Sequence, residues 1–369
     1  MHPLTVVILS AIVFRVGQAM WNAGAVRSKN AGSAIARQLC DLAIVTLASA
    51  LVGPLFAPKS DTDAWRGVTL ASAIIASSII PLAIAERASF FAGWPVSAVL
   101  GGVVIPISVR LLMSQVSAPI STVTTLPLAL ACGAGAAVGA AWWVGSRSGR
   151  YHRDGSSAIF PAHQFVFVGM GAFILLIALF LPTILTTADP ARTATSALAV
   201  VGAAIVTAVL WTRIRGGKTE VWSTVMGLCT ASLLLPVAYV WNPWSAALMG
   251  VVATLLGFFI THAIDLKFRI DDVGGQVGLW WSASIVGTLS LLGHGAWAGV
   301  EAQVAGIIFG SAGVAFVLAI VALLGFQLAC PIRVSDIDEY DGLDLAEHDV
   351  NAYPDFQQTT IKSYHTREA

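Results

Sequence analysis

The amino-acid sequence predicts an all-α integral membrane protein that crosses the bilayer about eleven times. Hydrophobic residues make up 57% of its 369 residues and charged residues only 11%, against about 45–50% and about 25% in soluble domains. The apolar residues also gather in runs of roughly 17–25, the length that an α-helix needs to span hydrocarbon. Helices satisfy their own backbone hydrogen bonds there, and the sequence lacks the alternation typical of barrel strands.

The predicted spans follow one another with short loops between them. In chain order they are Leu4–Gly24, Ala36–Phe56, Val68–Ala85, Phe91–Leu112, Thr122–Val144, Phe160–Ile184, Thr195–Trp211, Val221–Val240, Ala246–Ile264, Val273–Leu292 and Ala302–Ala329. Pro81 and Pro236 lie inside spans and are expected to kink them. The small residues of Ala131–Gly139 predict a close approach between helices.

Basic residues predict the orientation, because short cytoplasmic loops carry an excess of Lys and Arg. One set of alternate loops holds twelve: Arg27, Lys29, Arg37, Arg87, Arg147, Arg150, Arg153, Arg213, Arg215, Lys218, Lys267 and Arg269. The other set holds three: Lys59, Arg66 and Arg192. We therefore expect the N-terminus outside and the C-terminus in the cytoplasm of a cell-membrane protein.

Two domains are expected, a transmembrane domain over residues 1–329 and a cytoplasmic tail over residues 330–369. The tail is polar and too short to bury a core of its own. It must therefore pack on the transmembrane domain, bind a partner or stay mobile.

The sequence offers no enzymatic chemistry. It has no phosphate-binding glycine loop, no metal-ligand spacing and no nucleophile elbow, so we predict no catalytic residues, cofactor or metal. A formal net charge of +0 gives no indication of a nucleic-acid partner.

Several motifs, in order along the chain, carry a resemblance to a known family. They are Gly24-Ala-Val-Arg27-Ser-Lys29-Asn30, Ala85-Glu86-Arg87, Gly145-Ser-Arg147-Ser-Gly149-Arg150, Pro161-Ala-His163, Arg269-Ile-Asp271-Asp272 and the tail series Arg333-Val, Asp341-Gly342-Leu343-Asp344, His348 and Asn351-Ala-Tyr353. Together they resemble the ammonium transporter (Amt/MEP/Rh) family. The resemblance implies that family's fold, with two inverted five-helix halves, an eleventh helix and a homotrimer with one ammonium or ammonia pore per protomer.

The same resemblance locates the pore positions, and these differ from the family pattern. Leu130 and Trp280 align with the family's two pore histidines. Four more aligned positions have changed: Thr122 stands at an aspartate, Leu100 at the tryptophan of the outer cation site, and Ser72 and Pro182 at the two gate phenylalanines. An indole N–H only donates hydrogen bonds, so Trp280 cannot accept one from ammonium. The aligned positions leave open a packed core, an apolar route for a neutral gas, or a register shift that hides a working pore.

Two intramembrane charges need a separate explanation. Arg15 lies inside the first predicted span and Asp41 inside the second. A charged pair in hydrocarbon is either a structural anchor or a site for a ligand or lipid headgroup.

Two functions remain open from the sequence. The family role is ammonium transport, which the apolar pore positions do not support. The alternative is a non-conducting regulatory or scaffolding protein, because in the family the tail docks the nitrogen-signalling protein P-II. The residues that carry that tail motif here are Arg333, Asp341, Gly342, Leu343, Asp344, His348 and Tyr353. A mixed trimer with related subunits would reconcile a closed protomer with ammonium transport.

Overall fold

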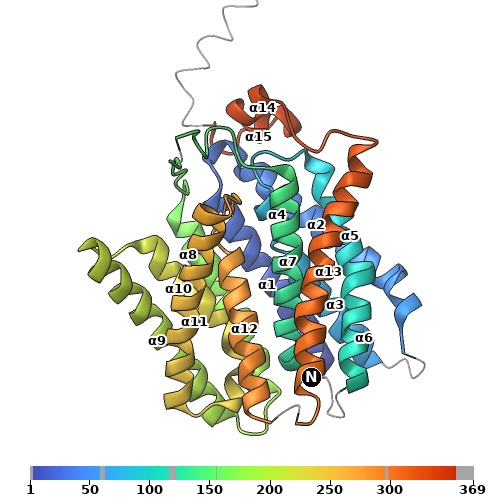
Figure 1. The fold of residues 1–369 in the computed structure, drawn as a ribbon, viewed down its shortest axis with the longest axis vertical. Coiled ribbons are helices and arrows are strands. Elements are labelled where there is room, and N and C mark those ends of the chain that lie inside the picture. The colour runs from blue at the N-terminus through green and yellow to red at the C-terminus, as the bar shows by residue number, and fades with distance from the viewer. Residues whose placement is uncertain (1–2, 59–62, 116–121, 155, 296–297, 355–369) are drawn as a thin grey trace, which may run out of the picture.

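The computed structural model describes residues 3–58, 63–115, 122–154, 156–295 and 298–354, and in these ranges its regular elements are helices, apart from two isolated β-bridges (Figure 1). The long helices are α1 (Pro3–Ala25), α2 (Ala31–Leu51), α3 (Asp63–Ser77), α6 (Ile105–Gln115), α7 (Thr122–Val144), α8 (Phe165–Leu185), α9 (Pro190–Gly216), α10 (Val221–Leu234), α11 (Pro243–His262), α12 (Val277–Gly293) and α13 (Glu301–Gln327). Shorter helices are α4 (Ile80–Ala83), α5 (Gly93–Val99), α14 (Asp336–Asp341) and α15 (Leu343–His348).

The predicted membrane fold is confirmed. Within the described residues, ten helical segments are long and apolar enough to cross a bilayer, and α12 is a shorter apolar helix that covers most of the tenth predicted span. Some of these segments join two elements, such as α5 and α6, which a π-helical turn at Leu100–Val104 connects.

Both predicted proline kinks are also present. Helix α3 ends at Ser77 and the chain resumes as α4, with Pro81 in its first turn. Helix α10 gives way to a 3-10 helix over Leu235–Val240, with Pro236 at its start. In each case the missing N–H of proline favours the change of helix.

The predicted starts of the second and third spans, Ala36 and Val68, are five residues late, since α2 begins at Ala31 and α3 at Asp63. Three further spans have wrong ends, each for a local reason. Helix α8 begins at Phe165 rather than Phe160, because Gln164 donates its backbone N–H to Gly24 instead of continuing a helix. Helix α12 begins at Val277 rather than Val273, after a turn in which Gly275 has a φ of 62°. Helix α9 is longer than predicted, since Asp189 caps its start and Gly217 ends it in the left-handed region.

The helices pack as a bundle in which α1 lies along α8 and α3, α7 along α13 and α12, and α11 along α9. The predicted close approach at Ala131–Gly139 is confirmed. A Cβ at Gly135 would lie 2.3 Å from the carbonyl oxygen of Ala312, and one at Gly139 would lie 2.5 Å from that of Phe316. Only glycine fits there, so α7 and α13 meet backbone to backbone.

Residues 331–354, with α14 and α15, lie across one end of the bundle, opposite the start of α1 (Figure 1). The loops Arg27–Asn30, Glu86–Ser89, Gly145–Arg153 and Asp265–Gln276 lie against or beside this segment. We call this end the tail face.

Candidate functional site

The position predicted to replace a pore histidine, Trp280, is filled by packed side chains. Trp280 is fully buried on α12, and its ring lies edge-on to Phe14 of α1 with centroids 6.1 Å apart. A Cβ on Gly133 of α7 would lie 2.8 Å from the indole Cζ3, so the ring occupies the space that glycine leaves. Leu130, one turn away on α7, is buried as well. Phe14 is fully buried too, so the ring of Trp280 is enclosed by side chains of α1 and α7.

Polar side chains next to this packed section lack partners. Gln18 of α1 donates a hydrogen bond to Gln276, which in turn lies 3.9 Å from the sulfur of Cys229. The indole nitrogens of Trp21 and Trp280 have no hydrogen-bond partner among the described residues, nor have the amide atoms of Asn22. Each orphaned buried group costs about 1–3 kcal/mol. The interior beside Trp280 is therefore polar on the side of Gln276.

Three of the other four aligned pore positions, Ser72, Leu100 and Pro182, lie at buried sites. Ser72 of α3 donates a hydrogen bond of 3.2 Å to Thr125 of α7. Leu100 is buried in the π-helical turn and Pro182 is buried within α8. Thr122 starts α7, but its side chain lies outside the described residues.

The intramembrane charges Arg15 and Asp41 form a buried ion pair between α1 and α2. Ser77 of α3 donates a 2.8 Å hydrogen bond to Asp41, and Ser97 of α5 also donates to this carboxylate. Four helices thus share one carboxylate, which suits a structural anchor. The guanidinium still has two nitrogens, Nε and Nη1, with no partner in the described part of the chain.

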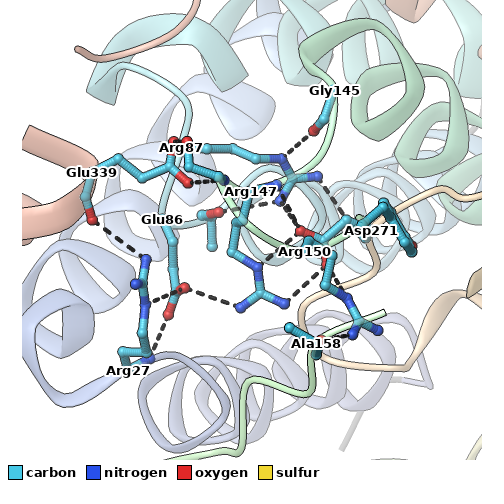
Figure 2. Close-up of polar contacts among 12 residues, drawn as sticks. Arg27, Glu86, Arg87, Gly145, Arg147, Arg150, Ala158, Asp271 and Glu339 are labelled. Atoms are coloured by element: carbon cyan, nitrogen blue, oxygen red, sulfur yellow. Dashed lines mark hydrogen bonds and ion pairs between the residues drawn. The ribbon is translucent and has the colours of Figure 1, made fainter. Parts of the chain in front are cut away.

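The tail face holds a buried ionic cluster centred on Glu86 and Asp271 (Figure 2). The guanidinium of Arg147 joins them, with Nη1 3.0 Å from Glu86 and Nε 2.8 Å from Asp271. Arg27 pairs with Glu86 from the loop after α1, and Arg87 donates to the backbone carbonyl of Asp271 at 2.9 Å. The cluster therefore joins loops that lie far apart in sequence.

Electrostatics favour the charged forms within this cluster. Burial alone would raise the pKa of Asp271, but Arg87 and Arg147 outweigh burial and hold that pKa well below its usual range. Burial likewise opposes the charge on Glu86, and Arg147 and Arg27 lower its pKa. Glu86 also has a φ of 69°, unusual for a residue with a side chain. Such strain persists where the surrounding contacts compensate for it.

The tail is attached to this face by three carboxylates. Glu339 accepts from the backbone N–H of Ser148 at 2.7 Å and pairs with Arg333 at 2.8 Å. Asp344 accepts from the backbone N–H groups of Gly32 and Ser33, at the start of α2.

The third carboxylate, Glu347, pairs with Arg37 at 2.7 Å and accepts from the N–H of Phe90. Buried, charge-assisted hydrogen bonds are the stronger kind. The tail thus packs on the transmembrane helices, one of the three outcomes left open by the sequence.

The other tail residues of the predicted motif also touch this face. The backbone N–H of Leu343 donates to Asn30 at 2.8 Å, and the ring of His348 lies edge-on to Phe90 at 4.8 Å. Tyr353 shares a 2.8 Å hydrogen bond with His163. Gly342 has a φ of 107°, and a Cβ there would lie 2.6 Å from Lys29, so no other residue fits.

Asp341 of the same motif is exposed at the end of α14. The quoted motifs did not include Glu339 or Glu347, although both residues make close contacts between the tail and this face. Gln18 and Gln276 were missed as well, and their signal was visible: each is an amide side chain in or beside an apolar run.

Comparison with known proteins agrees with this geometry. The model of the Ammonium Transporter Family matches residues 57–353. The chain is 27% identical to Ammonium transporter Amt2 of Archaeoglobus fulgidus, over 93% of this chain and 85% of that protein.

Among solved structures, the fold resembles one titled Sensor Amt Protein with a TM-score of 0.82, at 20% identity over 94% of this chain and 98% of that one. It also resembles Rh50 of Nitrosomonas europaea with a TM-score of 0.70, at 14% identity over 100% of this chain and 99% of that one.

Proposed function

This chain belongs to the ammonium transporter family, and from that premise we propose that it is a non-conducting member with a regulatory role at the membrane. The proposal rests on one observation: Trp280, which the sequence resemblance aligns with a pore histidine, is fully buried against Gly133 and Phe14. Conduction requires a continuous route, and a buried indole offers neither space nor an acceptor for ammonium.

We infer that the tail is the part that communicates with a cytoplasmic partner. Its inner surface is held by Glu339, Asp344 and Glu347, while its outer surface exposes apolar side chains. Ile337 and Tyr340 of α14 are 72% and 77% exposed. Exposed apolar side chains on a rigid element suit a protein interface. A P-II-type signalling protein is the partner we propose.

The remaining features of the proposal concern orientation and assembly. The tail face carries the basic loops, so we place it in the cytoplasm, with the N-terminus outside the cell membrane. We further propose a trimer, either of this chain alone or mixed with related conducting subunits. Cysteine labelling of Ile337→Cys in intact and opened cells tests the orientation, since labelling of intact cells contradicts it.

Transport in liposomes tests the central claim. Wild-type protein should give no ammonium-evoked current and no ammonia-driven pH change. The double variant Leu130→His/Trp280→His introduces the family's histidines at both aligned positions and tests for a gain of conduction. Its matched control is Leu130→His/Trp142→His, in which the second substitution lies at an exposed tryptophan. Conduction by the wild type at a rate comparable with a transporting relative would overturn the proposal.

Pull-down with a purified P-II protein tests the partner. Ile337→Asp should abolish capture without disturbing the tail contacts, because its side chain points to solvent. Ile159→Asp, at a similarly exposed position outside the tail, should leave capture unchanged. Equal capture by both variants, or no capture by the wild type, contradicts the assignment of the tail.

One observation favours a second candidate, slow passage of ammonia through a rearranged interior. The unpartnered side chains of Trp21 and Asn22, with the Gln18–Gln276 pair, form a polar section that a few water molecules would satisfy if Trp280 moved. The wild-type liposome measurement separates the two candidates. A pH change without current supports this one.

A further inference from the structure

A large cavity lies away from the packed section around Trp280, between the end of α9, the start of α10 and the end of α11. Its volume is about 870 Å³. In Figure 1, α9 leans away from α10 and α11 toward the end where it joins α10. Since these three segments are predicted spans, the cavity lies at the end of the membrane-crossing region on the side of the tail face.

The cavity has two chemically different parts. Leu255, Phe258 and Phe259 of α11 make an apolar wall, and Phe259 is largely exposed. Arg215 and Lys218 line it where α9 ends. An apolar wall beside basic side chains at the end of a span matches the boundary between acyl chains and headgroups.

The charges in the cavity leave a positive excess. Asp265 is already paired with Arg150 at 2.6 Å and accepts from Tyr151 at 2.8 Å. Glu220 accepts from the hydroxyl of Ser223 at 2.5 Å. Against this single unpaired carboxylate stand two cations, Arg215 and Lys218, for which the described residues provide no ion pair.

The arginine is also held in place. The guanidinium carbon of Arg215 lies 4.8 Å from the ring centroid of Trp211, one turn earlier on α9. Such stacking orients a guanidinium and leaves its N–H groups free to bind an oxyanion. Lys218 adds a second positive charge two residues beyond the end of the helix.

We propose that this cavity binds an anionic phospholipid, with its phosphodiester at Arg215 and Lys218 and an acyl chain along Leu255, Phe258 and Phe259. The basic pair accounts for the phosphate, and the apolar wall accounts for the chain. In the proposed orientation the site faces the inner leaflet, where anionic lipids attract basic residues. The bound lipid connects α9 to α10 and α11, the helices from which α9 diverges.

Lipid binding to the purified full-length protein tests this inference. Native mass spectrometry would measure the affinity for phosphatidylglycerol and for phosphatidylcholine with identical acyl chains. We expect phosphatidylglycerol to bind the wild type at least about ten-fold more tightly, since each basic side chain near an anionic headgroup contributes on the order of five-fold. The variant Arg215→Gln/Lys218→Gln should lose this preference.

Two controls separate charge in the cavity from charge elsewhere. Arg213→Gln removes a cation from the same helical turn that does not line the cavity, so it should keep the preference. The charge-conserving variant Arg215→Lys/Lys218→Arg should keep it as well. Equal affinity for the two lipids in the wild type, or an unchanged preference in the double Gln variant, would overturn the proposal.

A competition arm distinguishes the lipid from a free anion. Inorganic phosphate at millimolar concentration should not displace phosphatidylglycerol, because it lacks the acyl chain that fills the apolar wall. Displacement would assign the cavity to a soluble phosphate compound instead. Absence of any bound lipid at saturating phosphatidylglycerol would show that the cavity is filled otherwise, for instance by a second copy of the chain.

Discussion

The packed section around Trp280 and the tail face both bury polar side chains, but most of those on the tail face have partners and several of those around Trp280 do not. On the tail face, Glu86 and Asp271 are each bound by more than one donor. In the packed section, Trp280 and Asn22 have polar atoms without partners in the described chain. The tail face is held by many directional contacts, whereas the packed section has few, such as the Gln18–Gln276 hydrogen bond, and depends mainly on packing. The tail face therefore has one defined arrangement, while the packed section depends on which side chain fills it.

The largest effect is expected from breaking the ionic cluster. Asp271→Asn removes the charge that Arg147 contacts through Nε at 2.8 Å and Nη2 at 2.9 Å. Leaving buried arginines without their anion should cost about 3–5 kcal/mol, seen as a lower thermal unfolding midpoint in detergent. Asp265→Asn, at a more exposed carboxylate of the same face, is the control and should cost much less. Equal losses would contradict the special role of the cluster.

The stability of the packed section around Trp280 should depend on the volume of that side chain. Trp280→Ala deletes a fully buried ring and should cost about 3 kcal/mol of stability. Trp142→Ala removes the same side chain from a 55% exposed position on α7 and should have little effect. If both variants unfold at the same temperature, the central section is not a packed core.

The tail contacts should be separable from the stability of the bundle. Glu339→Gln weakens the pairing with Arg333, a charged hydrogen bond of the class worth about 1.5–3 kcal/mol. Trypsin cleavage after Arg333 should then be about ten-fold faster or more, while the unfolding midpoint of the transmembrane helices stays the same. Glu301→Gln, at the opposite end of the molecule, should not change the cleavage rate.

The smallest effect concerns pH. Burial raises the pKa of Asp272 to about 6, above the value near 3.9 of an unfolded chain. A raised carboxyl pKa means that the folded state binds the proton more tightly, so this contribution to stability is present below about pH 4 and is lost as the pH rises through 6. The unfolding midpoint should fall between pH 5 and pH 7.

Asp272→Asn should remove that fall, because asparagine still offers an oxygen to the N–H of Val277. Asp154→Asn, at a fully exposed carboxylate, should leave it in place. The lowered pKa values of Asp271 and Glu86 contribute no change in this window, because both groups stay ionised throughout it. An identical pH profile in wild type and Asp272→Asn would contradict the assignment.

The sequence predicted the fold well because hydrophobic length is a local property. Two of its errors lie at Phe160 and Val273, where apolar residues precede the helix. The chain near Phe160 is held by backbone contacts to residues 24 and 26, and the chain near Val273 turns at Gly275. The motifs identified Glu86, Arg147 and Asp271, but not that Arg147 pairs with both carboxylates, since three loops must meet to bring these residues together. The contacts of Glu339 and Glu347 depend on how the tail crosses the face, which no local pattern encodes.

The contact between Asp344 and the start of α2 also forms late during synthesis of the chain. Ser33 emerges from the ribosome 311 residues before Asp344, which corresponds to roughly 15–60 s at about 5–20 residues per second. Throughout that interval the first N–H groups of α2 lack the carboxylate that they bind in the finished molecule. Because α13 precedes the tail in the chain, the tail face can close only after all the long helices have been made.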